Sequence, residues 1–216
     1  MINKNLTEQD LAITVKIAES SNLTLSLKDI CTSIYAGGTP SRKNDSYWDN
    51  PSITWYKNGE VKNNILIDSE EHISDLALTG SSARIVPPLS ILFAMYCVST
   101  PQLAINAYEC TTNQAVCSLI IDNFQMMSYV YYYLMHYGIT LTNLANGAAQ
   151  QNLNKGMIEA FNVKVPTNQD ILLSILASHI LMKINLEKEN ARLAQLRDSL
   201  LPKLMSGEID VSNLGV

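Results

Sequence analysis

Two short stretches of the sequence have the residue types that contact phosphates and bases in nucleic acids. The first joins two glycines to hydroxyl and basic side chains, and its candidate contact residues are Gly37, Gly38, Thr39, Ser41, Arg42 and Lys43. Glycines allow a backbone to approach a ligand closely, and N–H groups, hydroxyls and cations suit phosphate oxygens. An ordinary surface turn explains the same residues equally well.

The second stretch, from Asn146 to Gly156, is a dense series of amide side chains with one lysine. Amides hydrogen-bond adenine edges in a major groove, and they also bond to phosphates and to protein backbone. The candidate contact residues here are Gln150, Asn152, Asn154 and Lys155, together with Lys57 and Asn58 from an earlier turn. The structural alternative is that Asn152 or Asn154 caps a helix beginning at Lys155.

The sequence has no recognisable catalytic motif. It lacks a Gly-rich S-adenosylmethionine loop after a strand, an Asn-Pro-Pro-Tyr motif, a Walker P-loop and a G-x-S-x-G elbow. Its histidines lie far apart and its cysteines have no zinc spacing, which predicts free thiols. The adjacent acids Glu70 and Glu71 are interpreted as the dipole-compensating start of a helix. We therefore predict a protein that is not an enzyme and needs no cofactor or metal.

The elements that position these stretches follow from hydrophobic periodicity and turn residues. Residues 1–23 are expected to form a leader, with a helix over Leu6–Ser20 that Asn5 or Thr7 caps. Residues 24–166 are expected to form one compact domain. Strands are predicted at Ser52–Tyr56, Ser90–Val98, Gln102–Ala107, Ala115–Ile121 and Phe161–Val165, and helices at Glu70–Leu78, Phe124–Tyr137 and Leu153–Ala160. Because these elements show no regular β-α-β rhythm, the predicted fold class is α+β, a mixed α/β domain.

A long helix is predicted over residues 167–205, with Thr167 as its N-cap and a tail at 206–216. Positions in it step alternately by three and four, as in a coiled-coil seam: Leu172, Ile175, His179, Met182, Leu186, Glu189, Leu193, Leu196 and Leu200. About 34 helical residues span ~50 Å, so the helix overhangs the domain and needs a partner outside it. His179 and Glu189 are interpreted as polar positions that help to set the register.

The charge of the chain limits how it could bind nucleic acid. Fifteen basic and 20 acidic side chains give a net charge of −5, which excludes a polybasic binder acting through charge alone. It also argues against a lone binder of acidic membranes. The sequence has no run of about 18 apolar residues and no apolar signal segment. These features predict a cytoplasmic protein without a membrane partner.

Taken in order, the motifs resemble the target-recognition domain of the DNA-specificity (S) subunits of type I restriction-modification systems. The resemblance covers residues 24–210 and rests on Gly37-Gly38-Thr39-Pro40-Ser41, Tyr47-Trp48, Ile53-Thr54-Trp55, Thr112-Asn113-Gln114-Ala115-Val116, Ala149–Lys155 and Leu196–Ile209. The family implies two recognition domains and two long helices that read a split site in double-stranded DNA. It also implies that the helices dock methyltransferase subunits, with a motor-nuclease subunit as a further partner, while the S subunit itself does no chemistry.

With one recognition domain and one long helix, this sequence resembles half of such a subunit. We therefore expect a homodimer with antiparallel helices that reads a symmetric, interrupted site, with methyltransferase subunits supplying most phosphate contacts. A different half subunit as the partner, or an inactive cassette remnant, is an alternative. Two rival functions are a dimeric scaffold or inhibitor that binds a protein, and a small-molecule or enzymatic domain.

Overall fold

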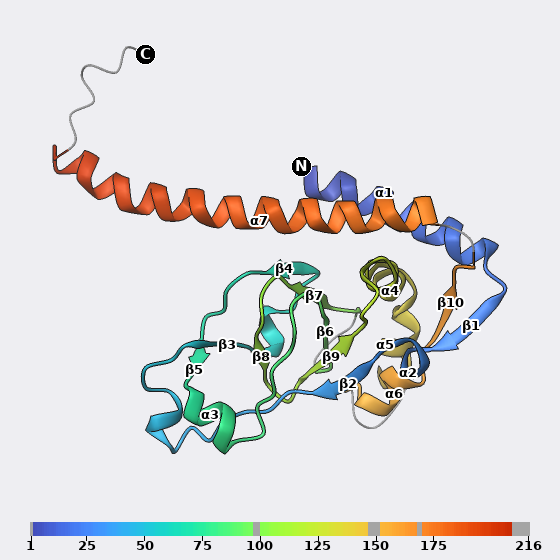
Figure 1. The fold of residues 1–216 in the computed structure, drawn as a ribbon, viewed down its shortest axis with the longest axis horizontal. Helices are drawn as coiled ribbons and strands as arrows, with labels where there is room; N and C mark the ends of the chain where they lie inside the picture. Colours follow the sequence, from blue (N-terminus) through green and yellow to red (C-terminus); the bar gives the residue numbers. More distant parts are fainter. Residues whose placement is uncertain (1, 97–99, 147–151, 168–169, 209–216) are drawn as a thin grey trace, which may run out of the picture.

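The computed structural model of the chain describes residues 2–96, 100–146, 152–167 and 170–208. Figure 1 shows a mixed α/β domain with two helices, α1 (Ile2–Ser20) and α7 (Asp170–Met205), running side by side along one side of it. The predicted mixed fold class with a long C-terminal helix is confirmed. Within the described residues, none of the helices is both long and apolar enough to cross a membrane.

The core of the domain is a five-stranded sheet of order β2-β9-β6-β7-β4. Its strands are β2 (Ser33–Ala36), β4 (Asn64–Leu66), β6 (Ile91–Ala94), β7 (Leu103–Asn106) and β9 (Val116–Ile120). All neighbours pair antiparallel except β4 and β7, which are parallel. Every residue of β6 and β7 is buried, because both faces of these central strands are covered. This explains why their sequences are nearly continuous apolar runs.

Two smaller sheets flank the core. One pairs β1 (Leu23–Ser26) with β10 (Asn162–Val165), and α2 (Leu27–Ile30) follows β1 directly, capped by Ser26. The other has the order β5-β3-β8, formed by β5 (His72–Ile73), β3 (Ile53–Tyr56) and β8 (Thr111–Thr112). The short helices η1 (Asp45–Tyr47) and η2 (Asn58–Glu60) lie on either side of β3 in the sequence.

The helix predicted over Glu70–Leu78 is wrong in its first half. Residues 72–73 form β5 and pair with β3, while α3 (Asp75–Gly80) begins only after Ser74. The hydroxyl of Ser74 accepts a hydrogen bond from the N–H of Ala77, which caps the helix at this point. Glu70 and Glu71 therefore precede a strand instead of opening a helix.

The remaining helices, α4 to α6, follow β9 in the chain. The helix α4 (Phe124–Tyr137) has the predicted bounds and buries most of its tyrosines, and α5 (Ile139–Asn146) follows it. The helix α6 (Lys155–Glu159) is shorter than predicted because Asn154 caps it. At the N-terminus, α1 includes Asn5 and Thr7 within its length, so neither is the cap that the sequence predicted.

The long helix α7 has a partner within the chain along its first half, which corrects the sequence expectation. It packs against α4, α1 and β4, and its buried residues lie between Leu173 and Ile184. The stripe that it buries lies beside the predicted seam and consists of Leu173, Leu176, Ala177, Ile180, Lys183 and Ile184. Residues 171–186 are apolar on more than one face, so the sequence pattern did not show which face the domain covers.

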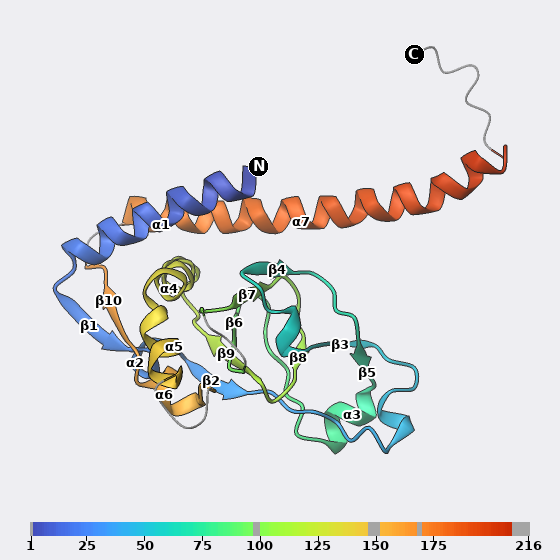
Figure 2. The ribbon, with the colours of Figure 1, turned by 180° about the vertical axis from the view of Figure 1, so that it is seen from behind.

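The second half of α7 extends beyond α1, as the predicted overhang requires (Figure 2). Its 36 residues correspond to a helix of about 54 Å. Leu193 and Leu196 are about half exposed in this part of the helix.

A buried polar cluster joins α1, α4 and α7. The carboxylate of Asp10 is fully buried, and it binds Lys183 Nζ at 2.9 Å and His179 Nδ1 at 2.6 Å. Lys183 Nζ also donates to Thr7 Oγ1 at 3.0 Å and to the Tyr132 hydroxyl at 2.8 Å. Burial is the main cause that raises the pKa of Tyr132, and the nearby Asp10 carboxylate raises it further. The pKa lies far above its usual range, so the hydroxyl stays protonated. His179 is therefore a hydrogen-bonded polar position, and its part in setting a register with another helix stays a prediction.

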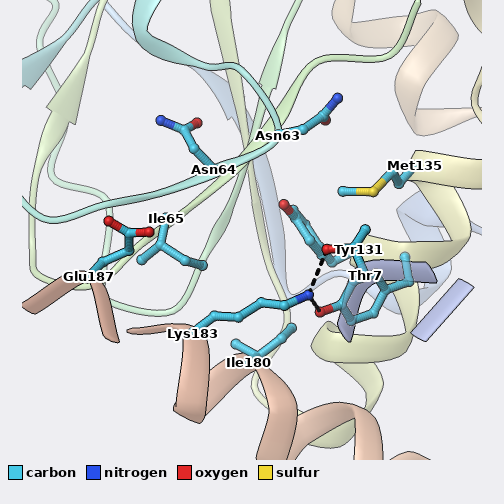
Figure 3. Close-up of a pocket in the computed structure, with 10 residues that line it drawn as sticks. Thr7, Asn63, Asn64, Ile65, Tyr131, Met135, Ile180, Lys183 and Glu187 are labelled. Carbon is cyan, nitrogen blue, oxygen red and sulfur yellow. Dashed lines mark hydrogen bonds between the residues drawn. The ribbon is translucent and has the colours of Figure 1, made fainter. Parts of the chain in front are cut away.

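A small cavity lies beside this cluster. Figure 3 shows Lys183 reaching from α7 toward Thr7 at the edge of the cavity. Its volume is about 150 Å³, and it is lined by Thr7, Asn63, Asn64, Ile65, Tyr131, Tyr132, Met135, Ile180, Lys183 and Glu187.

Removing the central carboxylate tests how firmly the cluster holds α7. The substitution Asp10→Ala leaves the Lys183 ammonium buried without its counter-ion, so we expect the free energy of unfolding to fall by about 3–5 kcal/mol. The double variant Asp10→Ala/Lys183→Met removes the charge as well and should be more stable than Asp10→Ala. Urea denaturation measures both, and a loss below about 1 kcal/mol for Asp10→Ala contradicts this role.

Candidate nucleic-acid interface

The first predicted contact stretch is fastened to residues 112–116, here called the central loop. The N–H of Gly38 donates to the carbonyl of Thr112 at 2.9 Å, and the N–H of Gly37 donates to the carbonyl of Val116 at 3.1 Å. The hydroxyl of Thr39 donates to the side-chain carbonyl of Gln114. Residues 37–39 therefore follow the central loop as an extension of β2.

The other predicted stretches reach the same loop. The N–H of Asn113 donates to the carbonyl of Tyr56, directly before Lys57. The N–H of Met95 donates to the carbonyl of Ala115, and the carbonyl of Met95 accepts from the N–H of Leu153. Segments that are distant in the sequence thus meet around the central loop.

Asn58 extends this arrangement to the end of β6. Its side-chain amide donates to the carbonyl of Tyr96 at 3.1 Å and accepts from the N–H of Tyr96 at 3.3 Å. Tyr96 is 39% exposed and follows Met95, to which residue 153 is bonded. The structure therefore brings Asn58 and the described part of the amide-rich stretch to the same edge of the domain.

The two glycines are required by packing within the chain. A Cβ atom at Gly37 would lie 2.1 Å from the carbonyl oxygen of Thr112, and one at Gly38 would lie 2.4 Å from the carbonyl carbon of Ser82. These approaches are closer than real Cβ contacts allow. The close approach that the sequence assigned to a ligand is made by the protein's own backbone.

The tryptophans hold the loop that follows. Trp55 is 2% exposed and its Nε1 donates to the carbonyl of Gly38 at 3.0 Å. Trp48 packs edge-on against Trp55, with ring centroids 5.4 Å apart, and its Nε1 donates to the carbonyl of Ser41. Trp55 is thus a packing residue of the domain and not an exposed surface for stacking bases. The guanidinium of Arg42 lies over the Trp48 ring, 3.6 Å from its centroid.

The cations near the tryptophans are paired with carboxylates that the sequence interpretation had placed in a helix. Arg42 Nη2 lies 2.5 Å from Glu71 Oε2, while Lys57 Nζ lies 3.0 Å from Glu71 Oε1 and 2.8 Å from Glu70 Oε2. The hydrogen bonds to Glu70 and Glu71 raise the pKa of Lys57 to about 12. Partial burial opposes ionisation of Glu71, but the bonds from Lys57 and Arg42 outweigh it and lower the pKa of that carboxyl.

The second stretch is partly structural. Asn154 caps α6 by accepting from the N–H of Met157 at 3.0 Å, as the structural alternative predicted. Lys155 pairs with Glu159 at 2.9 Å and also donates to the carbonyl of Ile34 in β2. Asn152 is exposed, and Gln150 lies outside the described residues.

Ser41 and Lys43 are exposed on the turn that carries Arg42, where the N–H of Lys43 donates to the Ser41 hydroxyl. Two side chains of this surface, Gln114 and Glu71, were not among the contact residues predicted from the sequence. Gln114 could have been predicted from the sequence, because it belongs to the motif from Thr112 to Val116. Glu71 could not have been predicted, because only the fold shows which cations it faces.

The chain is similar to known proteins over most of its length. Residues 21–197 match the family model for the type I restriction modification DNA specificity domain. The chain belongs to this family. The resemblance that its motifs predicted is confirmed, and the specificity domain includes both the recognition domain and most of α7.

Curated relatives of this specificity-domain chain are specificity subunits. It is 28% identical over 183 residues to the HindI specificity subunit of Haemophilus influenzae, covering 82% of this chain and 39% of the relative. It is 24% identical over 137 residues to the EcoR124I/EcoR124II specificity subunit of Escherichia coli, covering 61% and 34%. The chain spans well under half the length of these relatives.

Solved structures share the fold. An S subunit from M. genitalium aligns with a TM-score of 0.64 at 13% identity, over 94% of this chain and 54% of that one. The HsdS subunit of Thermoanaerobacter tengcongensis aligns with a TM-score of 0.53 at 13% identity, over 96% and 52%. The specificity-domain chain thus corresponds in fold to about half of each.

The glycine contacts at the central loop make a testable prediction. The substitution Gly38→Ala places a methyl group against Ser82 backbone, so we expect the free energy of unfolding to fall by about 1–3 kcal/mol. Gly59→Ala is the matched control, because a Cβ there meets nothing within 4 Å; its effect should stay within about 0.5 kcal/mol. Urea denaturation of both variants measures the difference, and equal stabilities contradict the packing role of Gly38.

Proposed function

We propose that this chain is the DNA-reading half of a type I restriction-modification specificity subunit and that it does no chemistry itself. The observation that supports this most strongly is the family match over residues 21–197. The surface around the central loop is consistent with it, because separate segments present amide, hydroxyl and basic side chains at one edge of the domain. The matched relatives are themselves specificity subunits.

In this proposal the central-loop edge contacts double-stranded DNA. Amide and hydroxyl side chains such as Asn58, Gln114 and Ser41 suit the donor and acceptor pattern of base edges. Lys43 is an exposed cation on this edge, and the structure records no ion pair for it among the described residues. Because a net charge of −5 leaves little to neutralise phosphates, methyltransferase subunits supply most of the phosphate contacts.

The proposed partner of α7 is a second copy of the chain. After the domain covers one stripe of the helix, apolar side chains remain exposed along its other side: Ile171 is 79% exposed, Met182 48%, Leu193 52% and Leu196 51%. These positions lie on or beside the predicted seam. An uncovered apolar stripe of this length favours a partner helix of the same kind.

The spacing of the seam specifies how two copies would pair. The seam positions are nearly symmetric about Leu186, so an antiparallel partner sets Leu200 beside Leu172 and Leu193 beside His179. Asp170 of one copy then faces Lys203 of the other, which adds a favourable charge pair. The two-fold axis passes near Leu186, and two identical domains read a symmetric, split site.

Cysteine cross-linking tests this register. In a Cys97→Ser background, Leu186→Cys should form a disulfide-linked dimer under mild oxidation, because the two copies of position 186 meet at the axis. Leu193→Cys is the control, since its two copies lie about 20 Å apart along the helices. The three native cysteines that remain should not form disulfides, because the reaction requires a thiolate. Burial raises the pKa of Cys31, Cys110 and Cys117 to about 12, so their thiols stay protonated. Equal cross-linking of both variants contradicts the register, and a monomer by light scattering contradicts the dimer.

Reconstitution tests the function itself. We expect the chain to co-purify with the DNA methyltransferase subunit from its own source and to restore methyl transfer to a specific DNA sequence. The methyltransferase subunit alone should not methylate that sequence, because it lacks the reading surface. Co-purification that leaves methylation absent, or that blocks it, favours a scaffold or inhibitor that binds a protein.

A further inference from the structure

The carboxylate of Glu71 is fixed between the two cations that border the tryptophans. Its backbone is held because the N–H of Trp55 donates to the carbonyl of Glu71 at 3.0 Å. Its two carboxylate oxygens are divided, one on Arg42 and the other on Lys57. The Arg42 guanidinium is thereby clamped between a carboxylate and the face of Trp48, yet its side chain remains 52% exposed.

The charges of this cluster cancel without help from DNA. Glu70 and Glu71 balance Arg42 and Lys57, and Glu60 adds a further carboxylate beside them. Glu60 accepts from the backbone N–H of Lys57 at 2.8 Å and from that of Glu70 at 3.2 Å. A surface whose cations are already paired offers little to a phosphate chain.

We propose that Glu71 is a specificity-determining residue of the DNA-reading surface. Its carboxylate keeps Arg42 and Lys57 from the phosphates of random DNA and holds the Arg42 guanidinium in one orientation over Trp48. This inference rests on the proposed function, because it requires the central-loop edge to face DNA.

The physical basis is the difference between non-specific and specific binding. Non-specific affinity comes almost entirely from cations that neutralise phosphates, and it falls as salt rises. Base readout depends instead on donors held in a fixed direction, as when an arginine binds guanine through two hydrogen bonds. A carboxylate that cancels the charge of a guanidinium while fixing its orientation lowers non-specific binding to phosphates. It leaves base readout by that guanidinium available.

Neutralising the carboxylate tests the proposal on the full chain. We expect Glu71→Gln to bind a random-sequence duplex on the order of threefold to tenfold more tightly than the wild type at low salt. Each freed cation steepens the slope of log affinity against log salt by about 0.9. The slope should therefore steepen by about 1 for Glu71→Gln and by about 2 for Glu70→Gln/Glu71→Gln. Fluorescence anisotropy over a salt series gives both quantities.

Two matched variants separate the release of Arg42 and Lys57 from the general effects of a changed net charge or a changed side chain. Glu19→Gln makes the same change in net charge on α1, which lies at the opposite end of the ribbon from β3 and β5 in Figure 1, and should leave the affinity for random DNA and the salt slope unchanged. Glu71→Asp keeps the charge and should retain the wild-type slope. Circular dichroism confirms that each variant is folded.

Several results would overturn the proposal. An unchanged affinity and slope for Glu71→Gln would do so, as would an equal gain for Glu19→Gln. Absence of random-DNA binding by the folded double variant at low salt would also contradict it. None of these depends on methylation, so the inference can fail while reconstitution with methyltransferase still supports the proposed function.

Discussion

The buried contact between Asp10 and Lys183 determines how the parts of this protein are placed relative to one another. Asp10 belongs to α1, Lys183 to α7 and Tyr132 to α4, so a single ionic cluster ties the N-terminal helix, the long helix and the domain together. Two charged groups removed from water stay there only when they are paired and hydrogen-bonded, and this cluster gives the lysine three partners. The cluster also fixes which face of α7 turns toward the domain, and therefore which face remains exposed for another helix.

The proposed reading edge depends on contacts within the chain in a similar way. Several residues around the central loop hold the neighbouring segments together. Gly37 and Gly38 allow the backbones to approach, Trp55 holds the carbonyl of Gly38, and Asn58 binds the backbone of Tyr96. Such a surface is held by internal hydrogen bonds and several of its cations are paired with carboxylates, which suits readout of shape and base edges better than attraction to phosphates. The low charge of the chain is then consistent with DNA binding inside a larger assembly.

How much of this could be predicted depended on whether the information was local. The strands β6, β7 and β9 and the helix α4 were predictable because apolar runs and periodicity mark buried elements. The overhang of α7 was predictable from length alone. The intramolecular partner of α7 was not, because two apolar stripes lie side by side on it and only the fold shows that Asp10 selects one. Glu71 was misread for a similar reason: two adjacent acids resemble a helix start until β3 and β5 pair and direct one of them at Arg42 and Lys57.

In the proposed function, this chain supplies sequence specificity to DNA methylation as a symmetric pair of DNA-reading domains on paired helices. Methylome sequencing of cells with and without the chain tests it most directly. The account predicts that methylation disappears from one motif only, and that this motif consists of two identical, inverted half-sites separated by a fixed gap. An unchanged methylome would contradict the reading function, and loss of an asymmetric motif would contradict the pairing of two identical copies.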